Sequence, residues 1–223
     1  MKVSRHTFWA TNSSGDVSGI LMRPTDATCL YVFAHGAGAG MEHSFMEAAA
    51  GQLADRGIAS FRYNFPYKEA GKKPPNRPPI LIETVRSAVT EASLLAPGLP
   101  LFAGGKSMGG RMASAAASRE PLPGVKGLVF FGFPFHPSGR DSAERGVHLA
   151  DVELPMLFLQ GTRDKLANLD LLTLLLDEVT PTPTLHIVDG ADHGFHVLKR
   201  SGRTDGEALA EMCDVFRDWV GEI

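Results

Sequence analysis

The chain has 223 residues, of which 43% are hydrophobic and 21% charged, and its formal net charge is −3. These values are typical of a globular protein, and they exclude the strongly basic balance of a nucleic-acid or membrane-surface binder. We therefore expect no nucleic-acid partner and no membrane partner. The length suffices for one sizeable core, which predicts a single domain over residues 1–223.

The N-terminal residues and the cysteines indicate a cellular compartment. Residues 1–6 lead into a polar segment, so we expect no signal peptide, and no apolar run is long enough to span a membrane. Cys29 and Cys213 fall in an expected strand and an expected helix, which favours two buried free thiols over a disulfide or a metal pair. Together these features predict a cytoplasmic protein.

Apolar runs and helical periodicity alternate along the chain. The expected strands cover residues 7–10, 19–22, 29–34, 58–63, a short run from 101, 125–131, 156–160 and 185–188. The expected helices cover residues 44–56, 80–95, 112–118, 169–179 and 205–220. This alternation predicts an α/β fold, with a mostly parallel sheet flanked by helices on both faces. Functional side chains in such sheets gather at the carboxyl ends of the strands.

Two longer connections are expected to lack regular structure. Residues 68–79 are basic and rich in proline, which indicates a loop. Residues 132–154 form an irregular connection that is too short for a helical cap domain. We therefore expect no large cap and a site that is open or covered only by loops, which favours small substrates over long-chain lipids.

A nucleophile motif follows the strand that begins at residue 101. Gly105, Ser107 and Gly109 form the pattern Gly-x-Ser-x-Gly between that strand and a segment rich in small, helix-prone residues. A sharp turn from strand to helix crowds the positions two residues either side of its apex, so glycine fits best there. Ser107 at the apex would stand at the start of the helix, where free N–H groups favour a developing negative charge.

A serine hydroxyl needs a base and an orienting acid to become a nucleophile. His193 lies in a glycine-flanked turn after the last strand, and Asp164 follows the preceding strand. The order Ser107, Asp164, His193 is that of a hydrolase triad, so we assign these residues as nucleophile, acid and base. The weaker alternatives are Asp192 for the acid and His186 or His196 for the base.

A glycine-rich loop follows the strand at residues 29–34. It begins His35-Gly-Ala-Gly, and its small residues would let the backbone approach a substrate carbonyl. We expect the Ala37 N–H and the Met108 N–H to form the oxyanion hole, in which one donor is worth roughly 100- to 1,000-fold in rate. His35 is expected to hold this loop by hydrogen bonds rather than to act in catalysis.

These segments together resemble a known family. The chain is similar to the α/β-hydrolases, and more narrowly to the small hydrolase-like proteins related to subunit 3 of the NSL histone-acetyltransferase complex and to testis-expressed protein 30. The segments that carry the resemblance are residues 35–38, 62–65, 104–111, 133–137, 160–164 and 192–193. The resemblance implies an α/β-hydrolase fold and the triad Ser107, Asp164 and His193. It implies no particular substrate, and the larger members act as complex subunits.

Aromatic residues and a histidine after strand ends are candidates for a substrate pocket. We assign Phe65, Phe133 and His136 to this role, although core packing is an equally good interpretation for the phenylalanines. The basic residues of the 68–79 loop could attract a carboxylate, but a solvated loop is the better interpretation.

The sequence therefore predicts a serine hydrolase that acts on a small acyl substrate through an acyl-enzyme. A carboxylesterase is the favoured activity, and the chemistry requires no metal and no organic cofactor. The same triad would also serve thioester or peptide hydrolysis, or acyl transfer. The alternative from a different class is a non-catalytic binding or scaffold module built on a hydrolase fold.

Overall fold

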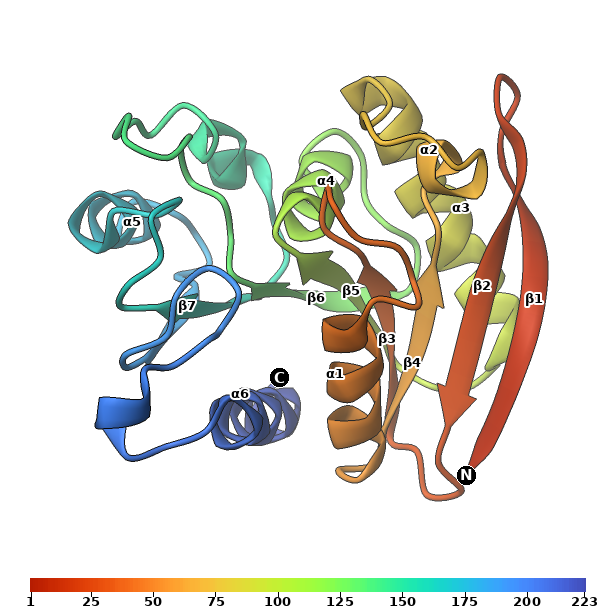
Figure 1. Ribbon diagram of the computed structural model, residues 1–223. Helices are drawn as coiled ribbons and strands as arrows, with labels where there is room; N and C mark the ends of the chain where they lie inside the picture. The colour runs from red at the N-terminus through yellow and green to blue at the C-terminus, as the bar shows by residue number, and fades with distance from the viewer.

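The computed structural model describes residues 1–223, which form one eight-stranded sheet with helices on both faces (Figure 1). The strands are β1 (Lys2–Thr11), β2 (Gly15–Arg23), β3 (Cys29–Ala34), β4 (Ile58–Tyr63), β5 (Leu101–Lys106), β6 (Val125–Phe131), β7 (Met156–Gly161) and β8 (Thr184–Val188). Their order in the sheet is β1-β2-β4-β3-β5-β6-β7-β8. The pairings of β1 with β2 and of β2 with β4 are antiparallel, and all the others are parallel. The sheet is mostly parallel, as predicted.

Helices cover both faces of this sheet. They are α1 (Ser44–Ala54), α2 (Pro66–Glu69), α3 (Pro78–Leu95), α4 (Met108–Ala117), α5 (Leu169–Leu176) and α6 (Asp205–Val220), with 3-10 helices η1 (Val147–Asp151) and η2 (Lys199–Ser201). Figure 1 shows α1 and α6 on one face and α3 and α4 on the other, and each face has its own hydrophobic core. Strands β3, β5 and β7 are buried along their whole length because both faces are covered. None of the helices combines the length and the apolar character needed to cross a bilayer.

Most elements follow the sequence pattern. The strands Cys29–Ala34, Ile58–Tyr63 and Val125–Phe131 and the helix Asp205–Val220 have their predicted ranges. The N-terminal hairpin is longer than predicted, because β1 and β2 stay paired along their exposed, polar ends. An edge strand of this kind carries a weak hydrophobic signal.

The prediction of a loop over residues 68–79 was wrong at both ends. Helix α2 covers Pro66–Glu69 and α3 begins at Pro78, so only the middle of the segment is irregular. Proline stands in the first turn of each helix, where its missing N–H would have had no intrahelical acceptor. Proline content alone therefore does not separate a loop from the start of a helix.

The two cysteines are buried free thiols, as expected. Cys29 and Cys213 both belong to the core between the sheet and the helices α1 and α6. Burial raises the pKa of Cys29 to about 11 and that of Cys213 to about 12, so both thiols stay protonated near neutral pH.

The connection between β6 and β7 carries a single short element, η1. No helical layer is inserted between these strands, in agreement with the prediction that there is no large cap.

The turn from β5 into α4 is crowded, as the glycine pattern predicts. A Cβ added at Gly105 would lie 2.3 Å from the carbonyl oxygen of Ala34, and one added at Gly109 would lie 2.4 Å from the same atom. Helix α4 therefore begins in direct contact with the end of β3. Any side chain larger than hydrogen would push these two elements apart.

We expect Gly109→Ala to destabilise the fold by about 2–4 kcal/mol, because the new methyl group would overlap backbone atoms that cannot move away independently. For a chain of this size the loss corresponds to a fall in Tm of roughly 5–15 °C, measured by thermal unfolding. Gly51→Ala in α1 is the matched control, since no atom lies within 4 Å of its added Cβ. An unchanged Tm in the Gly109 variant would show that the contact between α4 and β3 is loose.

Candidate active site

Ser107 stands at the turn between β5 and α4 in a strained backbone conformation. Its φ is 52° and its ψ is −118°. Residues other than glycine rarely adopt a positive φ of this size. Such a conformation costs on the order of 1–3 kcal/mol and persists only where the surrounding structure imposes it. The Ser107 N–H donates to the carbonyl of Phe131 at 3.1 Å, which helps to hold the turn in place.

The structure brings Ser107, His193 and Asp164 together. The Nε2 atom of His193 lies 2.8 Å from the Ser107 Oγ, and its Nδ1 atom lies 2.7 Å from the Asp164 Oδ2. Because a carboxylate only accepts hydrogen bonds, Nδ1 carries the proton, and the lone pair of Nε2 faces the serine hydroxyl. This arrangement is the one in which a histidine can take a proton from a serine.

The Asp164 carboxylate is held by more than the histidine. Its side chain is fully buried, and it accepts hydrogen bonds from the Gln160 side chain at 2.6 Å and from the Leu166 N–H at 2.7 Å. The Gln160 side chain in turn accepts from the Phe133 N–H at 2.9 Å. Gln160 thus fixes the carboxylate that orients the histidine. A glutamine at the end of an apolar strand, four residues before an assigned acid, is the signal by which the sequence could have indicated this role.

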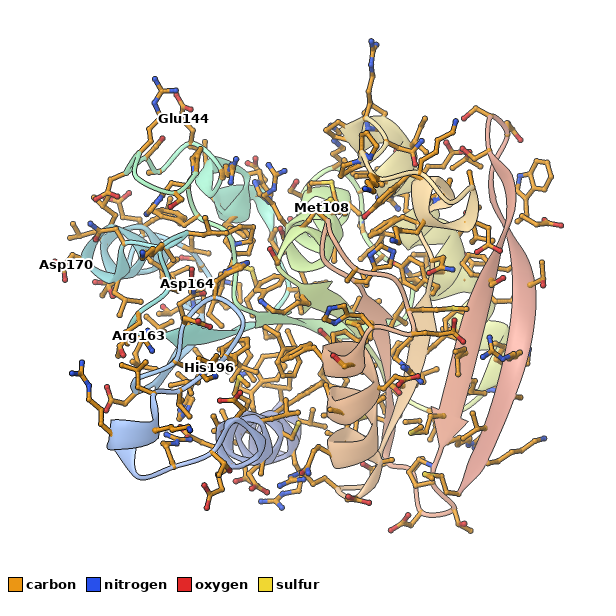
Figure 2. All side chains as sticks on the ribbon, in the orientation of Figure 1. Met108, Glu144, Arg163, Asp164, Asp170 and His196 are labelled. Atoms are coloured by element: carbon orange, nitrogen blue, oxygen red, sulfur yellow. The ribbon has the colours of Figure 1, made fainter.

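The three side chains come from loops at the same edge of the sheet. Ser107 follows β5, Asp164 follows β7, and His193 follows β8. Figure 2 shows Asp164 and its neighbour Arg163 in the loop after β7. Because β5 to β8 are parallel and adjacent, residues far apart in the sequence meet at their carboxyl ends.

The glycine-rich loop after β3 lies against the Ser107 turn. A Cβ added at Gly36 would be 3.7 Å from the Ser107 Cβ and 3.6 Å from the Lys106 carbonyl oxygen. The N–H groups of Ala37 and Met108, the two expected oxyanion donors, donate to no protein acceptor. Both donors therefore stay available beside the serine.

His35 holds this loop, as expected. The buried ring donates from Nδ1 to the Gly36 carbonyl at 2.8 Å and accepts at Nε2 from the Phe65 N–H at 3.1 Å. The Tyr67 hydroxyl donates to the Ala37 carbonyl at 2.7 Å. A trans peptide directs its C=O and N–H to opposite sides, so fixing the Gly36 carbonyl also fixes the direction of the Ala37 N–H. Burial lowers the pKa of His35 to about 4, so the ring is neutral near pH 7.

Two of the three predicted pocket residues belong to the core instead. Phe65 and Phe133 are fully buried and pack within the core on the α3 and α4 face. Because neither side chain has any exposed surface, neither lines an open pocket. His136 is also nearly buried, and its ring contacts the Pro137 carbonyl and the Asn168 N–H at 2.9 and 2.7 Å. Of the three, only His136 borders a surface hollow.

The residues considered as an alternative acid or base interact with groups outside the Ser107 site. Asp192 accepts from the Gly194 and His196 backbone N–H groups. The His186 ring pairs with Glu211 at 2.7 Å, and the His196 ring contacts Asp205 at the start of α6.

A second serine–histidine pair connects α4 with η1. The Ser114 Oγ lies 2.8 Å from the His148 Nε2. Ser114 is fully buried within α4 and donates to the Arg111 carbonyl, and no carboxylate is hydrogen-bonded to His148. This pair has neither the partly exposed serine nor the hydrogen-bonded carboxylate that the Ser107 site has.

Comparison with known proteins decides the family. A family model described as an alpha/beta hydrolase domain matches residues 27–221. The chain belongs to the alpha/beta hydrolase family. Its fold is therefore the α/β-hydrolase fold that the sequence predicts, and it has no lid.

Several solved structures have a fold similar to that of this hydrolase over nearly the whole chain. A serine hydrolase without lid from Xanthomonas campestris is 19% identical, with a TM-score of 0.75, over 98% of this chain and 95% of that one. A dienelactone hydrolase from Anabaena variabilis is 19% identical, with a TM-score of 0.74, over 100% and 99%. The esterase domain of a Rhodothermus marinus protein is 17% identical, with a TM-score of 0.73, over 98% of each chain. At these identities the likeness concerns the fold alone.

The neutral state of His35 makes the hydrolase sensitive to acid. The folded chain has a His35 pKa of about 4, below the ordinary value of 6.5, so the unfolded chain binds more protons between these two pH values. We expect the stability to fall as the pH drops from about 6.5 to 4, by about 3 kcal/mol from this residue. Urea unfolding across that range measures the effect.

The comparison variant for this measurement is His35→Asn, which carries no titratable ring. It should be less stable at pH 7 and should show a flatter slope between pH 6.5 and 4. His6→Asn, at a partly exposed histidine in β1 that does not contribute to the His35 shift, should keep the native slope. Equal slopes in the native chain and the His35 variant would contradict a buried neutral ring.

Proposed function

We propose that this α/β-hydrolase is a serine hydrolase that cleaves ester bonds through an acyl-enzyme, with Ser107, His193 and Asp164 as its triad. The observation that carries the proposal is the continuous hydrogen-bonded chain from the Ser107 Oγ through both ring nitrogens of His193 to the Asp164 carboxylate. A binding module would need neither this series of hydrogen bonds nor a strained serine at the open edge of the sheet.

The proposed reaction has two halves. The Ser107 Oγ attacks the ester carbonyl carbon while His193 takes the hydroxyl proton, and the carbonyl oxygen becomes an oxyanion held by the Ala37 and Met108 N–H groups. The carbon–oxygen bond to the alcohol then breaks, and His193 gives its proton to that alcohol. In the second half, water attacks the carbonyl carbon of the acyl-enzyme and gives a proton to His193. The bond from that carbon to the Ser107 Oγ then breaks, and His193 returns the proton to Oγ, which releases the acid and restores Ser107.

The substrate that we propose is a small, polar ester. With no cap over the site, little apolar surface is available to hold a long acyl chain. A cavity of about 600 Å³ borders His193, and its other lining residues, Arg163, Lys165, Asp192 and Gly194, include no hydrophobic side chain. Two cations and one carboxylate give the cavity a net positive charge. This charge favours an ester that carries a negative group.

Ester hydrolysis is favoured over the related reactions by the neighbours in structure, because two of these proteins are named as esterases. Thioester hydrolysis, peptide hydrolysis and acyl transfer would use the same groups. The narrower resemblance to the relatives of NSL complex subunit 3 and testis-expressed protein 30 adds no substrate. It supplies the competing hypothesis, a scaffold role in a complex.

The test is hydrolysis of p-nitrophenyl acetate and butyrate by the native chain and by Ser107→Ala, His193→Ala and Asp164→Asn. We expect each variant to lose at least about 1,000-fold in kcat, because the three groups act as a unit. Ser114→Ala is the matched control, since it removes the other histidine-paired serine, and it should retain activity. A native chain that is folded but inactive on all acyl esters and thioesters would reject the proposal in favour of a scaffold.

The charge of the cavity beside His193 gives a second test. We expect kcat/KM for a monoester of a short dicarboxylic acid to exceed that for a neutral ester of equal length, and added salt to reduce the difference. The double variant Arg163→Gln and Lys165→Gln should remove the preference, about 3- to 10-fold, and leave the neutral ester unaffected. Lys199→Gln, at an exposed lysine outside the cavity, serves as the control. A preference that persists in the double variant would place the anion elsewhere.

A further inference from the structure

Lys106 is a buried cation directly before the proposed nucleophile. It is the last residue of β5, and only 9% of its surface is exposed. Burying an ammonium group is costly unless it is paired or well hydrogen-bonded, so its surroundings need an explanation. The lysine forms no salt bridge.

The ammonium group contacts the turn that carries His193. The Lys106 Nζ donates to the backbone carbonyl of His193 at 2.5 Å. It also lies 5.0 Å from the centre of the Phe195 ring and 5.7 Å from that of Phe45 in α1. These two rings stack on each other, with centroids 5.9 Å apart and planes inclined by 19°. One lysine thus connects β5, α1 and the turn after β8.

The neighbouring backbone leaves space for this group. Gly132, with φ of 70°, follows β6, and a Cβ added there would lie 3.0 Å from the Lys106 Nζ and 3.6 Å from the His193 Nδ1. Phe195 has a φ of 64°, a conformation that is unfavourable for a bulky residue. The turn therefore carries strain on the order of 1–3 kcal/mol, which its contacts must offset.

We propose that Lys106 is a positioning residue that fixes the His193 turn relative to Ser107. This inference rests on the proposed function. His193 follows the last strand of the sheet in a turn whose backbone could shift while the fold stays intact. The Lys106 side chain donates its hydrogen bond to the backbone carbonyl of His193 itself. Lys106 is also the residue directly before Ser107 in the chain. Lys106 thereby fixes the position of the base His193 relative to the nucleophile Ser107. A displacement of about 1 Å between two such groups can cost about 100-fold in rate.

The charge of Lys106 gives this role a pH dependence. The titratable groups that face it are the carboxylates of Asp164 and Asp192, while its hydrogen bond to His193 is to the backbone carbonyl. Burial lowers the pKa of Lys106 to about 8, and the two carboxylates oppose this shift. The neutral amine can still donate a hydrogen bond, but it loses the charge-assisted strength and the attraction to the aromatic rings. We therefore expect kcat to decline as the pH rises through about 8.

The test is Lys106→Met, which keeps an unbranched side chain and removes the donor. We expect kcat for p-nitrophenyl butyrate to fall about 10- to 100-fold with KM within about twofold, and the decline near pH 8 to disappear. Phe45→Leu, which keeps the lysine and removes one ring, should fall only about 2- to 5-fold. A Lys106→Met enzyme with native kcat and a native decline near pH 8 would overturn the proposal.

Hydrogen exchange separates this proposal from the proposed function. In Lys106→Met, amides of residues 190–197 should exchange at least about 10-fold faster, while those of α3 stay unchanged. This readout needs no activity, so a native chain that hydrolyses no ester would reject the function and still test the connection. Unchanged exchange in residues 190–197 would show that Lys106 does not hold the turn. If Lys106→Met does not fold, kcat for p-nitrophenyl butyrate and the exchange of residues 190–197 are measured in Phe45→Leu instead. A native kcat together with native exchange rates in that variant would reject the proposal.

Discussion

The close contact between the start of α4 and the end of β3 is the constraint on which the site depends. Gly105 and Gly109 lie so near the Ala34 carbonyl that only hydrogen fits at either position. This contact forces the chain to turn sharply between β5 and α4, and the turn holds Ser107 in its strained conformation. The same contact brings the loop after β3, which carries the free Ala37 N–H, against the Ser107 turn.

The remaining groups reach Ser107 because the sheet is parallel from β4 to β8. The carboxyl ends of these parallel strands all lie at the same edge of the sheet. The loops that follow them therefore bring residues more than 80 positions apart within hydrogen-bond distance. The site is then stiffened by groups that would not touch a substrate. Gln160 holds the Asp164 carboxylate, His35 and Tyr67 hold the glycine-rich loop, and Lys106 contacts the turn that carries His193. Each of these is buried or nearly so, where a displaced polar group would be costly.

Local patterns were enough to predict the central strands and the meeting of Ser107, Asp164 and His193, because a turn between strand and helix demands glycine at set positions. Contacts between distant segments were not predictable in this way. An apolar residue after a strand, such as Phe133, can enter the core or line a pocket, and only the packing decides. Lys106 looks like a surface residue in sequence, because its acceptor is a backbone carbonyl 87 positions away that has no sequence signature.

The central claim is that Ser107 is an activated nucleophile, and covalent labelling tests it most directly. The native chain would be treated with a fluorophosphonate, and the modified residue would be located by mass spectrometry of its peptides. The account requires one adduct, on Ser107, that forms several orders of magnitude more slowly in His193→Ala. An adduct on Ser114 instead, or no adduct on a folded protein, would contradict it.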